Sequence, residues 1–265
     1  MTDAQDPARR RLGKRARHEH IVKALQTTST LRVSELAADL DVSTETIRRD
    51  LLELGDKGLI DRTYGGAARP LGAEPTVAER HRMMVPEREA IAKLSAALIR
   101  PNDVLLIGGG ATTTHVARRI AAVCRDLTVI THAFGVATVL AANPTITVII
   151  APGRYNAREG NMAGPETSEF LEAYSASWAI LGASGITAEG VSEAEPLAAS
   201  VYKTMMRRAA STMIVADHSK FDQHALAIWG RWSEIDHLIT DREPTGTLAR
   251  ALERGGVEVK ISSRP

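Results

Sequence analysis

A short run of polar and basic residues, from Ser43 to Leu54, has the spacing of an amphipathic helix. Ser43 is a good helix N-cap, because its hydroxyl can accept a hydrogen bond from an unpaired N–H of the first turn. Ile47, Leu51 and Leu54 follow at steps of four and three and form one apolar stripe. The side chains off that stripe are Thr44, Thr46, Arg48, Arg49 and Asp50. Such a helix fits the major groove, where its first turns reach base edges and phosphates.

Two further helices and a hairpin are predicted around this run. The first helix spans about residues 14–26, and a short second helix begins with Ser34 as its N-cap. Gly55 and Gly58 are expected to end the third helix. The strand at 59–63 then turns at Tyr64-Gly65-Gly66 and returns over 67–69. Together these are the parts of a helix-turn-helix with a wing, whose glycines allow close approach to phosphate.

Several alternatives remain open for this small domain. The fold could serve protein contacts, Arg49 or Asp50 could form an ion pair that orients the helix, and Thr44 could be only a first-turn residue. Six basic residues within positions 9–17 form either a solvated tail or an arm on DNA phosphates. Residues 1–13 are predicted to be a basic flexible arm.

A glycine- and threonine-rich loop marks a second candidate site. Gly108-Gly109-Gly110-Ala111-Thr112-Thr113-Thr114 directly follows the apolar run 104–107 and opens a helix. Helix N-terminal N–H groups and threonine hydroxyls together make an anion cradle. The loop matches neither a Walker A motif nor GxGxxG. The alternative is a tight turn that only packs against a sheet.

Asp217-His218-Ser219-Lys220 follows another apolar run, 213–216, and strengthens this interpretation. A lysine at the same sheet edge would supply the positive charge that a phosphate requires. Asp217 would hold that ammonium or bind a sugar hydroxyl. The alternative is a surface lysine paired with a structural aspartate.

Beyond residue 88 the pattern alternates between strands and helices. Strands are predicted at 104–107, 128–131, 146–150, 178–181, 213–215, 237–240 and 257–261. This alternation indicates an α/β domain with a largely parallel sheet, which binds ligands at the carboxyl ends of its strands. Pro70, Gly72 and Pro75 mark a boundary. The predicted domains are therefore the arm (1–13), the winged helix-turn-helix (14–70), a linker (71–88) and an effector-sensing and oligomerisation domain (89–265).

Composition excludes several other classes of protein. Of the 265 residues, 44% are hydrophobic and 25% charged, which excludes a disordered or fibrous chain. No apolar run approaches the roughly 18 residues of a membrane span, and the N-terminus has no apolar signal segment. A cytoplasmic protein without a membrane is expected. Cys124 is the only cysteine, and no histidine pair has ligand partners at metal-site spacing, so neither a metal nor a cofactor is expected.

The run VSTETIRRDLLELGDKGLIDRTYGGA, residues 42–67, closely resembles the DNA-binding signature of DeoR-family bacterial transcriptional regulators. Downstream, GGGATTTH, VITHAFGVA, LGASGITAEGV, ADHSKF and HLITD follow the effector domain of that family in order. That domain resembles the sugar-phosphate isomerase and deaminase fold. The resemblance therefore implies an α/β protein, in which a winged helix-turn-helix is joined to a Rossmann-like, sugar-phosphate isomerase-like effector domain.

The resemblance also implies two sets of binding residues. The DNA-binding candidates are Ser34, Ser43, Thr44, Thr46, Arg48, Arg49, Arg62, Tyr64, Gly65 and Gly66. The effector-binding candidates are Gly109, Gly110, Thr112, Thr113, Thr114, His132, Lys203, Asp217 and Lys220. Two places depart from the usual family pattern and line the expected pocket: Thr131-His132 replaces Thr-Asn, and Pro152-Gly153-Arg154 replaces Gly-Gly.

The implied function is sequence-specific binding of a double-stranded operator and repression of carbohydrate-metabolism genes, relieved by a phosphorylated sugar. A single module reads only a short half-site, so a homo-oligomer, either a dimer or a tetramer, is expected. The alternative is a sugar-phosphate isomerase or deaminase that carries a DNA-binding module. Isomerisation needs a carboxylate base, and Gly182-Ala183-Ser184-Gly185 offers none after the strand at 178–181. Binding without turnover, and no catalytic residue, is therefore expected.

Overall fold

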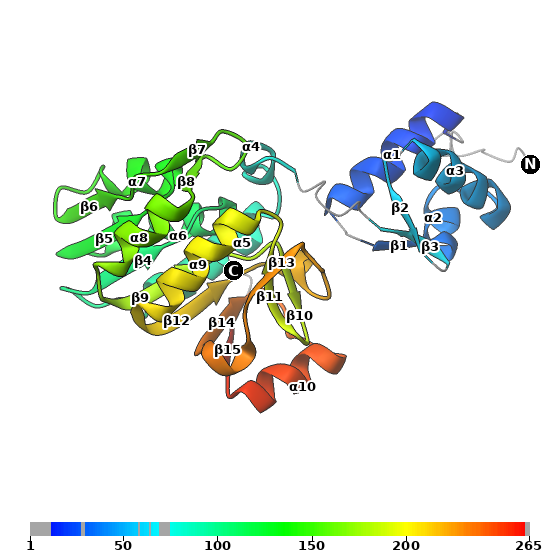
Figure 1. Ribbon diagram of the computed structural model, residues 1–265. Helices are drawn as coiled ribbons and strands as arrows, with labels where there is room; N and C mark the ends of the chain where they lie inside the picture. Colours follow the sequence, from blue (N-terminus) through cyan, green and yellow to red (C-terminus); the bar gives the residue numbers. More distant parts are fainter. Residues whose placement is uncertain (1–11, 28–29, 58, 64, 69–74, 263–265) are drawn as a thin grey trace, which may run out of the picture. The chain divides into compact units, whose positions relative to one another are not determined.

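The computed structural model describes residues 12–27, 30–57, 59–63, 65–68 and 75–262 (Figure 1). The chain divides into two compact units, residues 1–74 and 75–265, which are described separately. Most of the predicted arm, Tyr64 and the start of the predicted linker lie outside the described residues. From Pro75 onward the predicted linker groups with the larger unit, where it forms α4 (Val77–Arg80) and the first turn of α5 (Val85–Ala96).

The smaller unit is a winged helix-turn-helix, as predicted. Its helices are α1 (Lys14–Thr27), α2 (Val33–Asp39) and α3 (Thr44–Asp56). Its strands β1 (Thr30–Arg32), β2 (Asp61–Thr63) and β3 (Gly66–Ala68) form an antiparallel sheet in the order β1-β3-β2. Apolar side chains from all three helices meet in one core, which includes Ile21, Leu36, Ile47, Leu51 and Leu54.

Two local predictions in this unit were wrong, and one was confirmed. Arg32, not Ser34, is the N-cap of α2, because β1 remains extended to Arg32 and the helix begins directly after it. Ser34 is exposed within the first turn. The third helix continues through Gly55 and ends at Asp56, while Gly58 lies outside the described residues. A Cβ on Gly55 would lie 3.0 Å from Cδ of Arg62, so the glycine provides room for that side chain. Ser43 does cap α3, since its Oγ accepts the Thr46 N–H at 3.1 Å.

A buried carboxylate fixes α3 against α1. Asp50 is only 3% exposed and accepts hydrogen bonds from Nε of Arg17 at 2.8 Å and Nη2 of Arg17 at 3.1 Å. Nε2 of His18 lies 3.0 Å from Oδ1, the oxygen that also accepts Nη2 of Arg17. Burial raises the pKa of Asp50, but the hydrogen bonds from Arg17 and His18 outweigh burial, and the net pKa is lowered. Asp50 therefore orients the helix, which was one of the alternatives left open by the sequence.

The larger unit is built on a seven-stranded parallel sheet in the order β15-β14-β12-β9-β4-β5-β6. The strands are β4 (Val104–Ile107), β5 (Leu127–Thr131), β6 (Ile146–Ile150), β9 (Ala176–Leu181), β12 (Ala209–Val215), β14 (His237–Thr240) and β15 (Glu258–Ile261). Every strand predicted from the sequence is present. Each neighbouring pair in the sheet is parallel, so the carboxyl ends of all seven strands lie along one edge.

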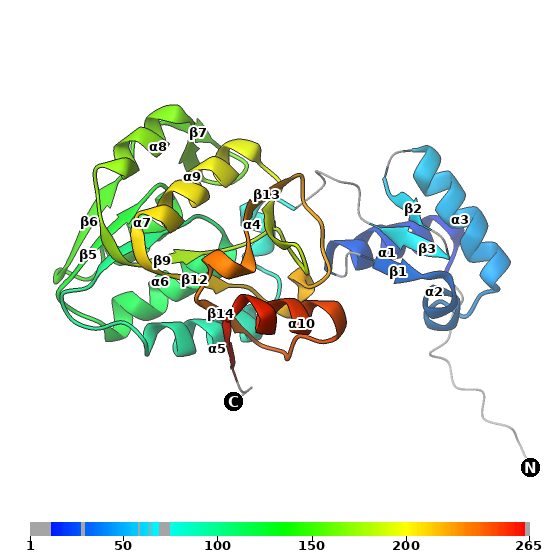
Figure 2. The same cartoon turned by 60° about the horizontal axis from the view of Figure 1, so that its bottom comes forward.

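Helices cover both faces of this sheet (Figure 2). On one face α5, α6 (Ala111–Val123) and α7 (Phe134–Leu140) pack against Leu105 and Ile107. On the other, α8 (Pro165–Glu172), α9 (Pro196–Arg207) and α10 (Gly246–Gly255) share a core with Leu106. Successive residues of β4 thus point to opposite faces, as a fully buried strand requires.

Short antiparallel strands at the carboxyl edge were not predicted. After β6, the strands β7 (Arg154–Asn156) and β8 (Asn161–Ala163) pair with each other. After β9, the strands β10 (Gly185–Thr187) and β11 (Gly190–Glu193) pair, and β13 (Ala227–Gly230) joins them. These segments of three or four residues are too short for alternation to reveal. Within the described ranges, no helix is long and apolar enough to cross a membrane.

We predict that Gly66→Ala destabilises the smaller unit. Gly66 lies in the central strand of the wing sheet, and a Cβ there would lie 2.1 Å from the carbonyl oxygen of Leu31. Strain of this kind costs about 1–3 kcal/mol. Amide hydrogen exchange across residues 30–68 should accelerate accordingly. Gly13→Ala is the matched control, because a Cβ at Gly13 meets nothing within 4 Å. Equal exchange in the two variants would contradict the packing role of Gly66.

Candidate nucleic-acid interface and effector site

The first turns of α3 present an exposed basic face. The side chains of Arg48 and Arg49 are 65% and 77% exposed, and Thr44 is exposed beside them. The carboxylate of Glu45 lies 3.7 Å from Nη1 of Arg48 and 3.5 Å from Nε of Arg49. Exposed ion pairs of this type contribute at most about 1 kcal/mol. Both guanidinium groups can therefore exchange Glu45 for a phosphate or a base edge at little cost.

Ser43 and Thr46 are engaged within the helix itself. The Ser43 Oγ accepts the Thr46 N–H at 3.1 Å, and the two hydroxyl oxygens lie 2.9 Å apart. Thr46 is also half-buried. Among the candidates on α3, the side chains presented outward without such a capping role are therefore Thr44, Arg48 and Arg49.

The wing divides its candidates between exposed and structural positions. Arg62 and Gly65 are exposed on the β2–β3 hairpin, and Gly65 has a φ of +90°, which favours glycine. Gly66 is buried, and its close approach to Leu31 makes it a packing requirement of the sheet. Tyr64 lies outside the described residues.

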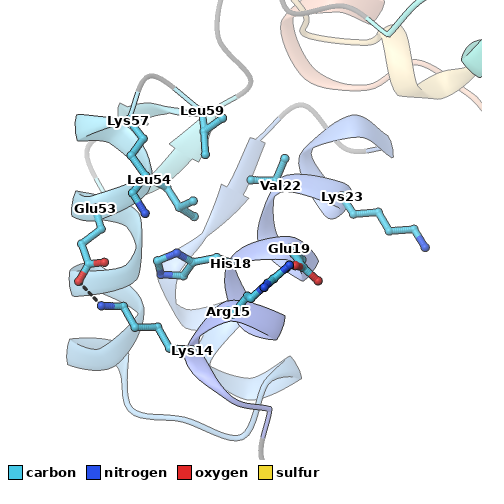
Figure 3. Close-up of a pocket in the computed structure, with 10 residues that line it drawn as sticks. All are labelled: Lys14, Arg15, His18, Glu19, Val22, Lys23, Glu53, Leu54, Lys57 and Leu59. Atoms are coloured by element: carbon cyan, nitrogen blue, oxygen red, sulfur yellow. Dashed lines mark hydrogen bonds and ion pairs between the residues drawn. The ribbon is translucent and has the colours of Figure 1, made fainter.

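A hollow of about 780 Å³ lies between α1 and α3 of the smaller unit (Figure 3). Val22, Leu54 and Leu59 contribute apolar surface to it. The charged residues around it have both signs, and Nζ of Lys14 bonds Oε1 of Glu53 at 2.5 Å. Without convergent positive charge, this hollow does not have the chemistry of a phosphate site.

The Gly-Thr loop joins β4 to α6, as the sequence predicts. Gly110 has a φ of +118°, and the hydroxyls of Thr113 and Thr114 donate to its carbonyl at 3.0 and 2.8 Å. Thr112, Thr113 and Thr114 are all buried. The hydroxyls of Thr113 and Thr114 therefore lock the first turn of α6. The backbone N–H groups of that turn are the donors that a helix N-terminus offers to an anion.

His132 holds this loop in place. It is fully buried, and its Nε2 accepts the Gly109 N–H at 3.1 Å, while its Nδ1 donates to the Met162 carbonyl at 2.5 Å. The Tyr202 hydroxyl donates to the Gly109 carbonyl at 3.0 Å. Burial lowers the pKa of His132 to about 4, although the bond to Met162 opposes this shift. The backbone N–H and the carbonyl of Gly109 are thus both already hydrogen-bonded within the protein, and His132 supports the loop as a neutral ring.

Asn161 lies beside the loop and was not singled out from the sequence. It is 3% exposed, and a Cβ on Gly109 would lie 3.0 Å from its Nδ2. Its buried Oδ1 has no hydrogen-bond partner among the described residues. A buried polar atom of this kind calls for a ligand donor or a water. No pattern in the sequence could have revealed it, because Asn161 reaches Gly109 only through the unpredicted β7–β8 hairpin.

Asp217 and Lys220 lie at the same sheet edge, beyond the end of β12. Asp217 is fully buried, accepts the Ser219 N–H at 3.2 Å and accepts Nε of Arg88 at 3.1 Å. Burial raises the pKa of Asp217, but the charges of Arg88 and Lys220 and the hydrogen bonds outweigh burial and lower it. The carboxylate is thus structural, and its arginine partner comes from α5. Lys220 is partly exposed in the short helical turn η1 (His218–Lys220).

The remaining candidates are placed differently. Lys203 is exposed on α9, and it is the preceding residue, Tyr202, that contacts the loop. The segment after β9, where an isomerase would need a carboxylate base, is a separate case. The Ser184 hydroxyl there donates to Glu193 at 2.6 Å, so this buried carboxylate is bonded within the protein. Within the part of the chain that the structure describes, no group of three or more His, Cys, Asp or Glu residues could hold a metal ion.

We predict that His132 makes the stability of the larger unit depend on pH. Its pKa is about 4 in the folded protein and about 6.5 when unfolded, so the unfolded chain binds the proton first. Stability should therefore fall as the pH falls from about 6.5 to about 4, by up to roughly 1.4 kcal/mol per pH unit. Urea unfolding of His132→Asn should lack this contribution, while the exposed-site control His224→Asn should retain it. Parallel pH profiles for all three proteins would contradict the assignment.

Comparison with known proteins identifies the family of both units. The DeoR-like helix-turn-helix domain matches residues 17–70, and the DeoR C terminal sensor domain matches residues 84–242. The HTH-type transcriptional repressor CsqR of Escherichia coli (strain K12) is 31% identical over 245 residues, covering 92% of this chain and 94% of that protein. The glycerol-3-phosphate regulon repressor of the same strain is 30% identical over 247 residues, covering 92% and 98%.

Solved structures give weaker similarities. Ribose 5 phosphate isomerase A from Neisseria gonorrhoeae has a TM-score of 0.39 and 14% identity, covering 52% of this chain and 53% of that one. The eIF2B delta subunit from Chaetomium thermophilum has a TM-score of 0.46 and 18% identity, covering 87% and 72%. Likeness at this level carries no functional conclusion. The two family matches and the near full-length relatives establish that the chain belongs to the DeoR family of transcriptional regulators.

Proposed function

We propose that this DeoR-family regulator is a repressor of carbohydrate-metabolism genes that binds an operator through α3 and the wing. The observation that carries the proposal is the exposed Arg48–Arg49 face on a helix braced by the buried Asp50. Such a helix can enter the major groove without rearranging its own core. The relatives CsqR and the glycerol-3-phosphate regulon repressor are both named repressors, which supports repression over activation.

The DNA contacts divide into two kinds. Arg48 and Arg49 are proposed to contact base edges and phosphates, with Thr44 at the positive end of the helix. Arg62 and Gly65 are proposed to contact the backbone from the wing. Because one such module reads a short half-site, the active form is proposed to be a homo-oligomer, either a dimer or a tetramer, that binds repeated sites on the DNA. The protein is proposed to act in the cytoplasm.

The effector is proposed to be a phosphorylated sugar bound at the carboxyl edge of the sheet. The first-turn N–H groups of α6, from Gly110 to Thr113, and the ammonium of Lys220 would hold its phosphate. Asn161 Oδ1 would accept a hydrogen bond from a hydroxyl of the sugar. Gly109, His132 and Asp217 would keep these groups in place, since their polar atoms are already bonded.

We predict that Arg49→Ala weakens operator binding about 10- to 100-fold, which corresponds to the loss of one good contact of about 1–3 kcal/mol. Fluorescence anisotropy on a duplex selected with the wild-type protein would measure this change. Arg207→Ala is the matched control, because Arg207 is also exposed and paired, with Glu172, but lies on α9. Wild-type affinity in Arg49→Ala, and likewise in Arg48→Ala, would refute α3 as the reading helix.

A second variant tests the effector site. Lys220→Ala should abolish the thermal stabilisation that the best of a panel of phosphorylated sugars confers on the wild type, because ligand binding raises stability by mass action. Operator affinity without the sugar should remain unchanged. Lys260 lies on the edge strand β15, and the control variant Lys260→Ala should be stabilised by the sugar as the wild type is. A normal response of Lys220→Ala would place the phosphate elsewhere.

A further inference from the structure

The first residues of the larger unit are fastened to the β7–β8 hairpin. The Val77 N–H donates to the Arg158 carbonyl at 3.1 Å. The guanidinium of Arg80 bonds both oxygens of Glu159, at 2.5 and 3.2 Å, and also donates to the Pro75 carbonyl at 2.6 Å. The side chains of Arg80 and Glu159 are only 10% and 13% exposed. The segment that follows the DNA-binding unit in the chain is therefore held at the same sheet edge as the proposed effector site.

A second guanidinium joins this segment to the end of β12. Arg88 Nε donates to Oδ2 of Asp217 at 3.1 Å, and its Nη1 donates to the main-chain carbonyl of Arg80. The side chains of Arg88 and Asp217 are 3% and 0% exposed. One planar group thus bridges the loop that carries Lys220 and the end of α4. Because the donors of arginine form a rigid fork, a displacement at one end is transmitted to the other.

Asp217 is also tied to Lys220. Its Oδ1 accepts the N–H of Ser219, which caps the turn η1, and the ammonium of Lys220 contributes to its electrostatic environment. An anion that recruits Lys220 reduces the positive charge acting on Asp217. Arg88, which already acts on this buried carboxylate more strongly than Lys220 does, then carries more of its charge compensation, and the other donor of Arg88 is fixed on Arg80.

We infer that Arg88 is a positioning residue that couples the effector edge of the sheet to residues 75–83, the segment through which the DNA-binding unit is attached. The inference rests on the proposed function and deepens it, because it names the route by which a bound phosphate reaches the connection to the DNA-binding unit. Arg80 and Glu159 complete the route at the β7–β8 hairpin. The buried location of both ion pairs keeps the route largely unscreened by salt.

Hydrogen exchange on the full chain tests this route. The N–H groups of Val77, Arg80 and His81 are bonded, so their exchange reports on the segment. In Arg88→Lys, the single ammonium can keep the ion pair with Asp217 but cannot also donate to the Arg80 carbonyl in the same geometry. Exchange over 76–83 should rise at least tenfold, while exchange over η1 and β5 remains as in the wild type. Asp217→Asn should accelerate both 76–83 and η1.

The controls separate coupling from general loosening. Arg207→Lys, at an exposed pair on α9, should leave every segment unchanged. Unchanged exchange over 76–83 in Arg88→Lys, or equal acceleration throughout the larger unit, would overturn the inference.

A second experiment adds inorganic phosphate to both proteins. Phosphate should slow exchange over the Gly-Thr loop and η1 in both wild type and Arg88→Lys, but should alter exchange over 76–83 only in the wild type. Failure of phosphate to protect either loop would count against the proposed effector site, and the variant comparison would still decide the coupling.

Discussion

Asp50 and Asp217 are buried carboxylates, and each is held by an arginine from a different element. Arg17 of α1 binds Asp50 on α3, and Arg88 of α5 binds Asp217 beyond β12. A buried charge that loses its partner is strongly destabilising, so each pair restricts the elements that carry it to one arrangement. The positions of α3, the proposed reading helix, and of the Lys220 turn therefore both depend on the same kind of interaction.

The two proposed sites use their charges in opposite ways. On α3, Arg48 and Arg49 are exposed and only loosely associated with Glu45, so they can change partners on meeting DNA. At the sheet edge, the polar groups of Gly109, Thr113 and Thr114 are already bonded within the protein. Such a loop is preorganised, and binding an anion there requires little ordering of its backbone.

The candidate site was predictable in position but not in the division of roles. The sequence placed the Gly-Thr loop, His132, Asp217 and Lys220 at one edge, because parallel strands align their carboxyl ends. It included His132 among the effector-binding candidates, and in the structure the ring of His132 is bonded to Gly109 and Met162. Residue type indicates what a side chain can bond. Only its neighbours in space decide whether those bonds are already made.

Local patterns in the sequence determined the presence of the three helices of the winged domain, though not the start of α2 or the end of α3, together with the Ser43 cap and all seven parallel strands, because periodicity and capping act within a few residues. They also determined the family, through the run from Val42 to Ala67. Tertiary structure alone decided the partners of Asp50, the place of Asn161 beside Gly109 and the pairing of Arg88 with Asp217. The last pair is separated by 129 positions in the chain. Contacts of this kind arise when separate elements pack together, and no periodicity within one element records them.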